Sequence, residues 1–457
     1  HEKEGSPQKF DLRPTRPIRL EGECALNIIS STFYNSSCFT EGSFLHLGST
    51  RDISISSCDF EECFSEGGRA HAIYITDQNK CQITIEDCMF LNCGKNSKGH
   101  VICCKVPGLI FSRNNISFTN TNCSGCINCI GKGKYHFIGN YFSNARMSMI
   151  PDGDAQYKSV GINYEGDSNF QDEEDLVIDE NHFRNIIGSN YGRCLSLQVQ
   201  EGKLNILTKN IIESCALGGF CIKIMQRKAI DTFELNGWEF RNNIIDDSFG
   251  GGAGIWIENE AVSNNMYTYN YTLIIKDCIF ENNSCLKKGG GFQIGYAGYV
   301  DKDKYVTRVE VQISGCNFEK NTANEEGGAL AIQTNYPLTI TNCRFINNSS
   351  LVSGGAIFIG TFVPDPSGNN QQMPYATITD CEFIDNFGNN AHCIYIHDGP
   401  KTPIEITYCV FVNNFNENSE KSACVLSNSI ELTVKGCYFI NNDLEHSSGG
   451  VNVTSRS

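Results

Sequence analysis

Cysteine offers the widest range of chemistry in this sequence, because a thiol can bind a metal, form a disulfide or act as a nucleophile. The chain of 457 residues contains 24 cysteines. The most metal-like spacing is Cys123-Ser-Gly-Cys126-Ile-Asn-Cys129, with Cys103 and Cys104 upstream. Such C-x-x-C steps can hold zinc or an iron–sulfur cluster. In a chain this rich in cysteine, disulfides or core packing explain the spacing better, so we predict no metal site and no cofactor.

Histidine and carboxylate groups give weaker indications of chemistry. His392 and His397 with Asp398 are metal-ligand types, but we expect them to be ordinary exposed side chains near a corner of the fold. Asp246 and Asp247 are a carboxylate pair, yet neighbouring residues on a strand point to opposite faces. Neither group predicts an active site by itself.

A repeated pattern determines how these side chains are positioned. In Ile340-Thr-Asn-Cys343-Arg-Phe345, an aliphatic residue stands three places before a cysteine and a phenylalanine two places after it. The frame fits fourteen times, and nine of the thirteen intervals are 26 to 30 residues long. The residues at the cysteine position are Ser31, Cys58, Cys88, Asn114, Asn140, Asn181, Asn210, Trp238, Cys278, Cys316, Cys343, Cys381, Cys409 and Cys437.

The positions around the frame alternate between apolar and polar residues. The third residue before the cysteine position is always apolar, and the fifth is apolar except at Asn205. The second residue after it is phenylalanine except at Ile116 and Ile212. This period of two indicates strands with one buried face. A second aliphatic stripe often follows a glycine pair, as after Gly327 and Gly354, and glycine gives the backbone the freedom that a tight corner needs.

Short strands separated by Gly, Asn and Asp corners predict an all-β fold, a parallel β-helix of about fourteen coils. A leucine-rich horseshoe lacks its consensus here, and a propeller needs longer repeats. We expect residues 1–23 to form an N-terminal arm or cap and residues 24–457 a single parallel β-helix. Loop insertions are expected near residues 145–175, 259–271, 295–306 and 361–375.

Two short motifs link the repeats to a known family. F-x-x-N recurs from Phe240–Asn243 to Phe439–Asn442, and G-G-A-[ILV] occurs at Gly327–Leu330 and Gly354–Ile357. From about residue 230 onward, the sequence resembles the repeats of chlamydial-type polymorphic outer-membrane proteins. The resemblance implies a right-handed, pectate-lyase-like β-helix displayed on a cell surface, often adhesive. We expect this chain to be part of a longer polypeptide whose anchor or further segments lie elsewhere.

The asparagines of the F-x-x-N motif are expected to stack along one corner of the helix. Stacked amides can hydrogen-bond along a column and satisfy corner carbonyl groups. This gives them a structural role at Asn243, Asn283, Asn321, Asn348, Asn386, Asn414 and Asn442.

The cysteines of the frame are expected to form a second inward column. Neighbours in such a column lie about 4.8 Å apart with parallel side chains, whereas a disulfide needs converging side chains. We therefore predict buried free thiols at Cys278, Cys316, Cys343, Cys381, Cys409 and Cys437, and disulfides at cysteines outside the column, such as Cys38, Cys81, Cys123 and Cys129.

A carbohydrate-active enzyme is the main catalytic alternative. Glycoside hydrolysis needs two carboxyl groups roughly 5–9.5 Å apart, which means outward acids on neighbouring coils. On the outward face of the first strand, the acids are Glu86, Asp179, Glu234 and Glu405, and no two fall on adjacent repeats. No catalytic residue is therefore predicted, although insertions can still supply a polysaccharide lyase or hydrolase site.

Three insertions follow the glycine-led strand and should form one ridge of loops. Insertions on one face of a repeat protein often mark its binding face, and tyrosine is enriched in recognition surfaces. The ridge tyrosines predicted to bind a partner are Tyr267, Tyr269, Tyr271, Tyr296, Tyr299, Tyr305 and Tyr375.

Asn-x-Ser/Thr sequons mark sites that could carry glycans. At the overlapping pair, we expect modification of Asn347 and not of Asn348, which belongs to the inward column. The glycosylation candidates are Asn35, Asn115, Asn270, Asn282 and Asn347.

Charge and hydropathy limit the partners. With 36 basic and 52 acidic residues the formal charge is −16, which argues against nucleic acid. No apolar run is long enough for a transmembrane helix. The sequence thus predicts an extracellular or cell-surface scaffold or adhesin that presents a tyrosine ridge to a protein or glycan, on another cell or in the same assembly. The alternatives are a pectate-lyase-like enzyme and a structural subunit that stacks end to end.

Overall fold

The computed structural model describes most of the strands of the chain and leaves out many connecting segments. All regular elements in the described part are β-strands, and no helix there is long and apolar enough to cross a membrane. The described residues are 18–22, 25–35, 37–38, 45–49, 51–65, 70–76, 82–94, 99–119, 122–123, 125–131, 133–147, 160–166, 175–188, 193–199, 204–217, 222–226, 232–245, 255–259, 270–294, 308–333, 337–360, 376–397, 403–414, 423–427, 431–442 and 448–453.

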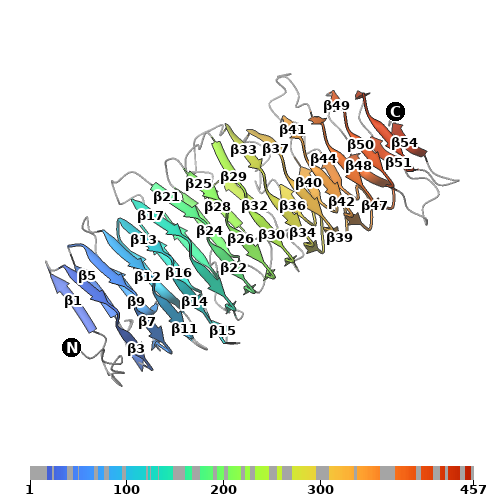
Figure 1. The fold of residues 1–457 in the computed structure, drawn as a ribbon. Helices are drawn as coiled ribbons and strands as arrows, with labels where there is room; N and C mark the ends of the chain where they lie inside the picture. Colours follow the sequence, from blue (N-terminus) through green and yellow to red (C-terminus); the bar gives the residue numbers. More distant parts are fainter. Residues whose placement is uncertain are drawn as a thin grey trace, which may run out of the picture. The chain divides into compact units, whose positions relative to one another are not determined.

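The chain divides into two compact units, His1–Ala216 (unit 1) and Leu217–Ser457 (unit 2). In each unit, every coil gives one strand to each of three parallel sheets, which we call A, B and C in chain order (Figure 1). A short corner strand often follows the strand of sheet C. The sequence prediction of a single β-helix over residues 24–457 is not tested by this division and stays a prediction.

Sheet A contains the strands that glycine pairs often precede. In unit 1 its strands are β1 (Ile18–Gly22), β5 (Leu45–Ser49), β9 (Ala70–Thr76), β12 (His100–Lys105), β16 (Ile127–Ile130), β20 (Ile162–Glu165) and β24 (Leu195–Val199). In unit 2 they are β28 (Ile222–Gln226), β32 (Ile255–Asn259), β36 (Phe292–Ile294), β40 (Leu330–Gln333), β44 (Ile357–Gly360), β48 (Ala391–His397), β51 (Ala423–Ser427) and β54 (Ser448–Val453). The strand β1 lies within the predicted N-terminal arm.

Sheet B contains the aliphatic strands of the repeat frame. In unit 1 they are β2 (Leu26–Ile29), β6 (Ile53–Ser56), β10 (Ile83–Glu86), β13 (Gly108–Ser112), β17 (Lys134–Ile138), β21 (Asp175–Asp179) and β25 (Leu204–Thr208). In unit 2 they are β29 (Thr232–Asn236), β33 (Asn270–Lys276), β37 (Arg308–Ser314), β41 (Leu338–Thr341), β45 (Ala376–Thr379), β49 (Ile404–Thr407) and β52 (Leu432–Lys435).

Sheet C contains the strands centred on phenylalanine. In unit 1 they are β3 (Thr32–Tyr34), β7 (Asp59–Glu61), β11 (Met89–Leu91), β14 (Asn115–Ser117), β18 (Tyr141–Ser143), β22 (His182–Arg184) and β26 (Ile211–Glu213). In unit 2 they are β30 (Glu239–Arg241), β34 (Ile279–Glu281), β38 (Asn317–Glu319), β42 (Arg344–Ile346), β46 (Glu382–Ile384), β50 (Val410–Val412) and β53 (Tyr438–Ile440).

The remaining strands are two residues long and lie at corners. In unit 1, β4 (Ser37–Cys38) pairs with β8 (Phe64–Ser65), and a separate row contains β15 (Asn122–Cys123), β19 (Arg146–Met147) and β23 (Ile187–Gly188). The next strand, β27 (Ala216–Leu217), consists of the last residue of unit 1 and the first residue of unit 2. In unit 2 the corresponding row is β31 (Ile244–Ile245), β35 (Ser284–Cys285), β39 (Thr322–Ala323), β43 (Ser349–Ser350) and β47 (Phe387–Gly388).

Equivalent residues of successive coils pair in register, as the repeat frame requires. In unit 1, Ile55 pairs with Ile85 in sheet B and Phe60 with Phe90 in sheet C, and all four are fully buried. With seven strands of sheet B described in each unit, the predicted parallel β-helix of about fourteen coils is confirmed.

Aromatic stacking fills the inside of sheet C. In unit 2 the rings of adjacent coils lie nearly parallel with centroids 4.7–5.0 Å apart. Burying each ring stabilises the fold by about 1.5–3 kcal/mol, and stacking adds to it. The column comprises Phe240, Phe280, Phe318, Phe345, Phe383, Phe411 and Phe439.

Left-handed residues make the two corners that flank sheet C. The first corner lies immediately before the cysteine position of the frame and the second lies four residues after it. In one coil these are Asn342 (φ 52°) and Asn347 (φ 53°). In another they are Asp380 and Asp385, also with positive φ. Asn and Asp tolerate this backbone conformation, which explains their frequency in the repeats.

The glycine pair before sheet A is required by close backbone approach. Gly327 has φ +71°, and a Cβ on Gly328 would come within 2.2 Å of the carbonyl oxygen of Gly355 in the next coil. No side chain larger than hydrogen fits at that distance. The second glycine of the G-G-A motif is therefore required wherever two coils approach this closely.

An amide ladder provides hydrogen-bond partners for the backbone groups at the second corner of unit 2. Asn348 is fully buried, and its Oδ1 accepts hydrogen bonds of 3.0 Å from both the backbone N–H and Nδ2 of Asn321. Its Nδ2 donates to the carbonyl oxygen of Phe318 (2.8 Å) and to Oδ1 of Asn386 (3.0 Å). The structure places all the asparagines of the predicted column here, each at most 3% exposed: Asn243, Asn283, Asn321, Asn348, Asn386, Asn414 and Asn442.

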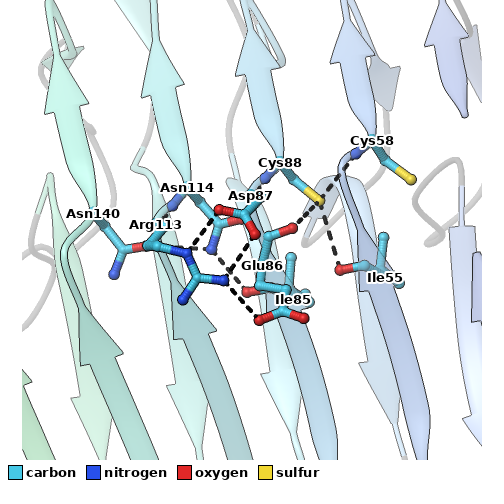
Figure 2. Close-up of polar contacts among 9 residues, drawn as sticks. All are labelled: Ile55, Cys58, Ile85, Glu86, Asp87, Cys88, Arg113, Asn114 and Asn140. Atoms are coloured by element: carbon cyan, nitrogen blue, oxygen red, sulfur yellow. Dashed lines mark hydrogen bonds and ion pairs between the residues drawn. The ribbon is translucent and has the colours of Figure 1, made fainter. Parts of the chain in front are cut away.

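In unit 1 the equivalent ladder occupies the first corner (Figure 2). Oδ1 of Asn114 accepts from the backbone N–H of Cys88 (2.9 Å), and its Nδ2 donates to the carbonyl oxygen of Ile85 (2.9 Å). One coil earlier, Sγ of Cys88 lies 3.7 Å from the carbonyl oxygen of Ile55 and accepts from the N–H of Cys58 (3.4 Å). A thiol thus takes the place of an amide. The ladder comprises Asn114, Asn140, Asn181 and Asn210.

Thiols fill the first corner of unit 2. Each donates toward the carbonyl oxygen two residues earlier, at 3.2–3.6 Å. None of the nineteen cysteines whose side chains are described forms a disulfide. The column comprises Cys278, Cys316, Cys343, Cys381, Cys409 and Cys437.

Replacing Asn348 with alanine is expected to destabilise unit 2. The change leaves the buried N–H of Asn321 and the carbonyl group of Phe318 without these partners, and each such loss costs about 1–3 kcal/mol. We expect the free energy of unfolding to fall by about 2–5 kcal/mol, measured by the guanidinium midpoint. Asn347→Gly is the matched control, because Asn347 is exposed and glycine readily adopts its left-handed backbone. Equal losses in the two variants would contradict the ladder.

Candidate functional site

The predicted tyrosine ridge lies outside the described side chains. Only the backbone of Tyr271 is described, in β33; Tyr267, Tyr269, Tyr296, Tyr299, Tyr305 and Tyr375 fall in segments that the structure does not describe. The flanking strands are described, however. Each of the three insertions leaves sheet A and enters sheet B, between β32 and β33, β36 and β37, and β44 and β45. They therefore belong to the same corner of unit 2.

Next to this corner, the outward face of sheet A carries aromatic side chains. Phe358 of β44 pairs in register with Tyr395 of β48, and their ring centroids are 5.8 Å apart. His397 follows on the same face, 5.6 Å from Tyr395 and 6.5 Å from Phe358. Phe358 is 2% exposed, whereas Tyr395 and His397 are half-buried. We call Phe358, Tyr395 and His397 the aromatic–histidine cluster.

A cation lies beside this cluster. Nζ of Lys288 is 4.5 Å from the centroid of the Phe358 ring and 2.6 Å from Oε2 of Glu326. Ala331 lies opposite Phe358 on the adjacent strand β40, and its small side chain leaves room for the lysine to reach across. A cation over a ring is favourable, and the ion pair with Glu326 fixes its position.

The cluster has groups for binding rather than for bond cleavage. A half-buried phenol and imidazole can stack on an apolar sugar face and donate hydrogen bonds to hydroxyl groups. Glu326 is its single described carboxylate, and Lys288 already neutralises it. Glycoside hydrolysis by a carboxylate pair is therefore not supported at this position.

The sequence analysis missed a polar cluster on sheet C of unit 1. Nε2 of His182 lies 3.0 Å and Nε of Arg184 lies 3.3 Å from Oε1 of Glu213. The ring of Tyr141 contacts His182 edge-on at 5.1 Å, and a hydrogen bond to Tyr141 raises the pKa of Arg184. The signal for this cluster lies at the outward positions of the phenylalanine strands. The sequence prediction about acids rested on the aliphatic strands of sheet B alone.

Sheet C of unit 2 also carries acids on neighbouring coils. Glu281 pairs in register with Glu319. Glu281 forms an ion pair with Arg241, and Glu319 with Lys320 at 2.6 Å. The sequence analysis found no two acids on neighbouring coils of sheet B. Sheet C does carry such a pair. Because both carboxylates have cationic partners, we interpret this group as an ion-pair ladder.

The cysteines with metal-like spacing whose side chains are described do not form a group that could hold a metal. Cys103 and Cys104 are consecutive in β12 and point to opposite faces. Cys104 pairs in register with Cys129, both are fully buried, and burial raises the pKa of Cys104. Among the described residues, no three His, Cys, Asp or Glu side chains are placed to hold a metal. Cys129 is not in a disulfide, so its predicted pairing is wrong; the side chains of Cys38, Cys81 and Cys123 are not described.

His392 is not the exposed side chain that we expected. It is fully buried, its Nδ1 lies 3.1 Å from the carbonyl oxygen of Gly388, and burial lowers its pKa. His392 lies at a register shift of β48, whereas His397 contacts the ring of Tyr395 on the outward face. The two histidines therefore do not share a site.

The glycosylation candidates lie in different environments. Asn35, Asn282 and Asn347 are exposed at left-handed corners. Nδ2 of Asn282 donates to Oδ1 of Asn242 (2.7 Å). Asn115 is half-buried, and the side chain of Asn270 is not described.

Asn347 and not Asn348 is expected to accept a glycan in a host that modifies sequons. Asn347 is exposed, whereas Asn348 is fully buried with both amide atoms hydrogen-bonded. Enzymatic removal of the glycan converts its asparagine to aspartate, so peptide sequencing by mass spectrometry identifies the position. Conversion of Asn348 to aspartate with Asn347 intact would contradict the exposed position of Asn347 and the buried position of Asn348.

Residues 235–457 match the family model described as a right handed beta helix region. Neither the curated proteins nor the solved structures include a match to the chain. The family match supports the right-handed parallel β-helix, a fold that occurs in both enzymes and proteins without catalytic activity.

Proposed function

We propose that this chain is a non-catalytic scaffold of a cell-surface or extracellular protein, and that unit 2 binds a glycan at the aromatic–histidine cluster. The observation that carries the proposal is the outward position of Tyr395 and His397 beside the corner from which three insertions leave. The resemblance of the repeats to adhesive surface proteins supports the location.

The chemistry of the cluster favours a sugar over an apolar ligand. Rings of Tyr395 and His397 present both an apolar surface and a polar tip, and Lys288 adds a cation close by. The single carboxylate, Glu326, is already paired. Because Lys288 and Glu326 neutralise each other, the cluster gives no preference for acidic over neutral glycans.

The first test is glycan binding by the full chain and its variants. We expect Tyr395→Ala and His397→Ala each to weaken binding about tenfold or more, which corresponds to ~1.4 kcal/mol, because each removes a contact surface. Binding is screened on an array of neutral and acidic glycans and measured by calorimetry. Tyr438→Ala is the control, because Tyr438 is 67% exposed on sheet C. No bound glycan, or unchanged affinity in both cluster variants, would overturn the proposal.

Catalysis at the Tyr141–His182–Arg184–Glu213 cluster of unit 1 is the second candidate. A carboxylate against an imidazole orients it for proton transfer, and Arg184 can bind an acidic group of a substrate. This arrangement fits proton abstraction better than hydrolysis by two carboxyl groups, because Glu213 is its single acid.

Depolymerisation of acidic polysaccharides tests this second candidate. If unit 1 is catalytic, purified chain will release new chain ends, and His182→Ala will reduce the rate about 10²-fold or more. Glu281→Gln in the ion-pair ladder should leave the rate unchanged. Absence of product, or equal rates in wild type and His182→Ala, would exclude catalysis at this cluster.

A further inference from the structure

We propose that Cys393 and Cys424 form a redox-active pair that closes to a disulfide between adjacent coils of unit 2. Cys393 belongs to β48 and Cys424 to β51, which are neighbours in sheet A. Their Sγ atoms are 3.3 Å apart, and both residues are fully buried.

This pair differs from the thiol column at the first corner. There, each thiol is directed at a backbone carbonyl oxygen, as Cys343 is at that of Thr341 (3.2 Å). Equivalent positions of regular coils lie about 4.8 Å apart with parallel side chains, whereas a disulfide needs a Cβ separation near 3.8 Å and converging side chains. The column is therefore poorly placed for disulfides.

A β-bulge brings Cys393 and Cys424 together. Ala391 pairs with Ala423 and Ile394 pairs with Val425, so two residues of β48 lie opposite Cys424 alone. The extra residue breaks the parallel register and lets the two thiols approach each other. Closing the bond requires the sulfurs to move from 3.3 Å to about 2.05 Å. The small, buried side chains of Ala391 and Ala423 flank the pair.

The oxidation requires an acceptor for two electrons. The acceptor in this proposal is a small-molecule disulfide such as oxidised glutathione. Two S–H bonds are lost and one S–S bond forms between Sγ of Cys393 and Sγ of Cys424. The two electrons break the S–S bond of the oxidant, and the two released protons complete its two thiols. Burial raises the pKa of Cys393, so little thiolate is present and closure should take place slowly.

A second pair provides an internal comparison. In unit 1, the Sγ atoms of Cys194 and Cys215 are 3.9 Å apart. The Cys215 thiol also donates to the carbonyl oxygen of Glu213 (3.3 Å). With a longer separation and a competing partner, this pair should close more slowly than Cys393–Cys424.

The test is oxidation of the full chain in a glutathione redox buffer, followed by blocking of remaining thiols and peptide mapping without reduction. Trypsin cleaves at Lys401 and Lys421, between the two cysteines, so a disulfide joins separate peptides, and fragment sequencing distinguishes Cys393 from Cys381. We expect the Cys393–Cys424 link to form first and to raise the unfolding temperature of unit 2 by roughly 5–10 °C.

Variants separate this link from general oxidation. Cys393→Ser and Cys424→Ser should each abolish both the linked peptide and the temperature shift, and Cys343→Ser in the thiol column should preserve both. The proposal would be overturned if the thiol-blocking reagent still modified Cys393 and Cys424 completely after oxidation. It would also be overturned if column cysteines became linked at an equal rate. Neither result depends on glycan binding, so the two proposals can fail independently.

Discussion

The fold depends on satisfying the backbone polar groups at two buried corners of every coil. A left-handed residue turns the chain at every described corner except that at Phe118, and the N–H and carbonyl groups beside it point along the helix axis toward the neighbouring coil. Burial without a partner would cost about 1–3 kcal/mol for each group, repeated at every turn. Asparagine solves this problem with one side chain, because its amide both accepts and donates. Cysteine is a weaker substitute that makes the same contacts with one sulfur atom.

The two units use the same solution at different corners. In unit 1 the described amide ladder follows the first corner, from Asn114 to Asn210, and in unit 2 it follows the second, from Asn243 to Asn442. The other corner holds mainly thiols or apolar side chains, and Thr119 is an exception in unit 1. Because the interior is occupied by these columns and by stacked phenylalanines, the outward faces and the insertions between strands are what is left for the proposed binding. The aromatic–histidine cluster lies where these two kinds of surface meet.

Much of the fold follows from the sequence because the repeat reports it many times. The inward phenylalanines, the corner asparagines and the glycine pairs each recur at fixed offsets, so one error in the frame would conflict with all other coils. The burial of Asn348 beside exposed Asn347 could therefore be predicted from register alone. The Cys103–Cys129 spacing was equally visible, and alternation along a strand explains why Cys103 and Cys104 point to opposite faces.

The candidate sites were less predictable because they depend on contacts that do not repeat. Tyr141, His182 and Glu213 come from three coils and share no motif, so they become a group only once the register of sheet C is known. His392 was misplaced because it lies at a register shift of β48, which the repeat frame does not reveal. The approach of Cys393 to Cys424 has the same origin. Local irregularity is thus where the sequence is least informative.

The amide ladder also bears on how such a protein can change in length. Each asparagine binds only the coil before it and the coil after it, through the same atoms every time. Duplicating or deleting one complete coil would therefore join surfaces that already fit, whereas gaining or losing a few residues within a strand would misalign every subsequent amide. Evolution of this chain by whole coils would leave its cross-section unaltered, and variation of smaller size would be confined to the insertions that leave the corners.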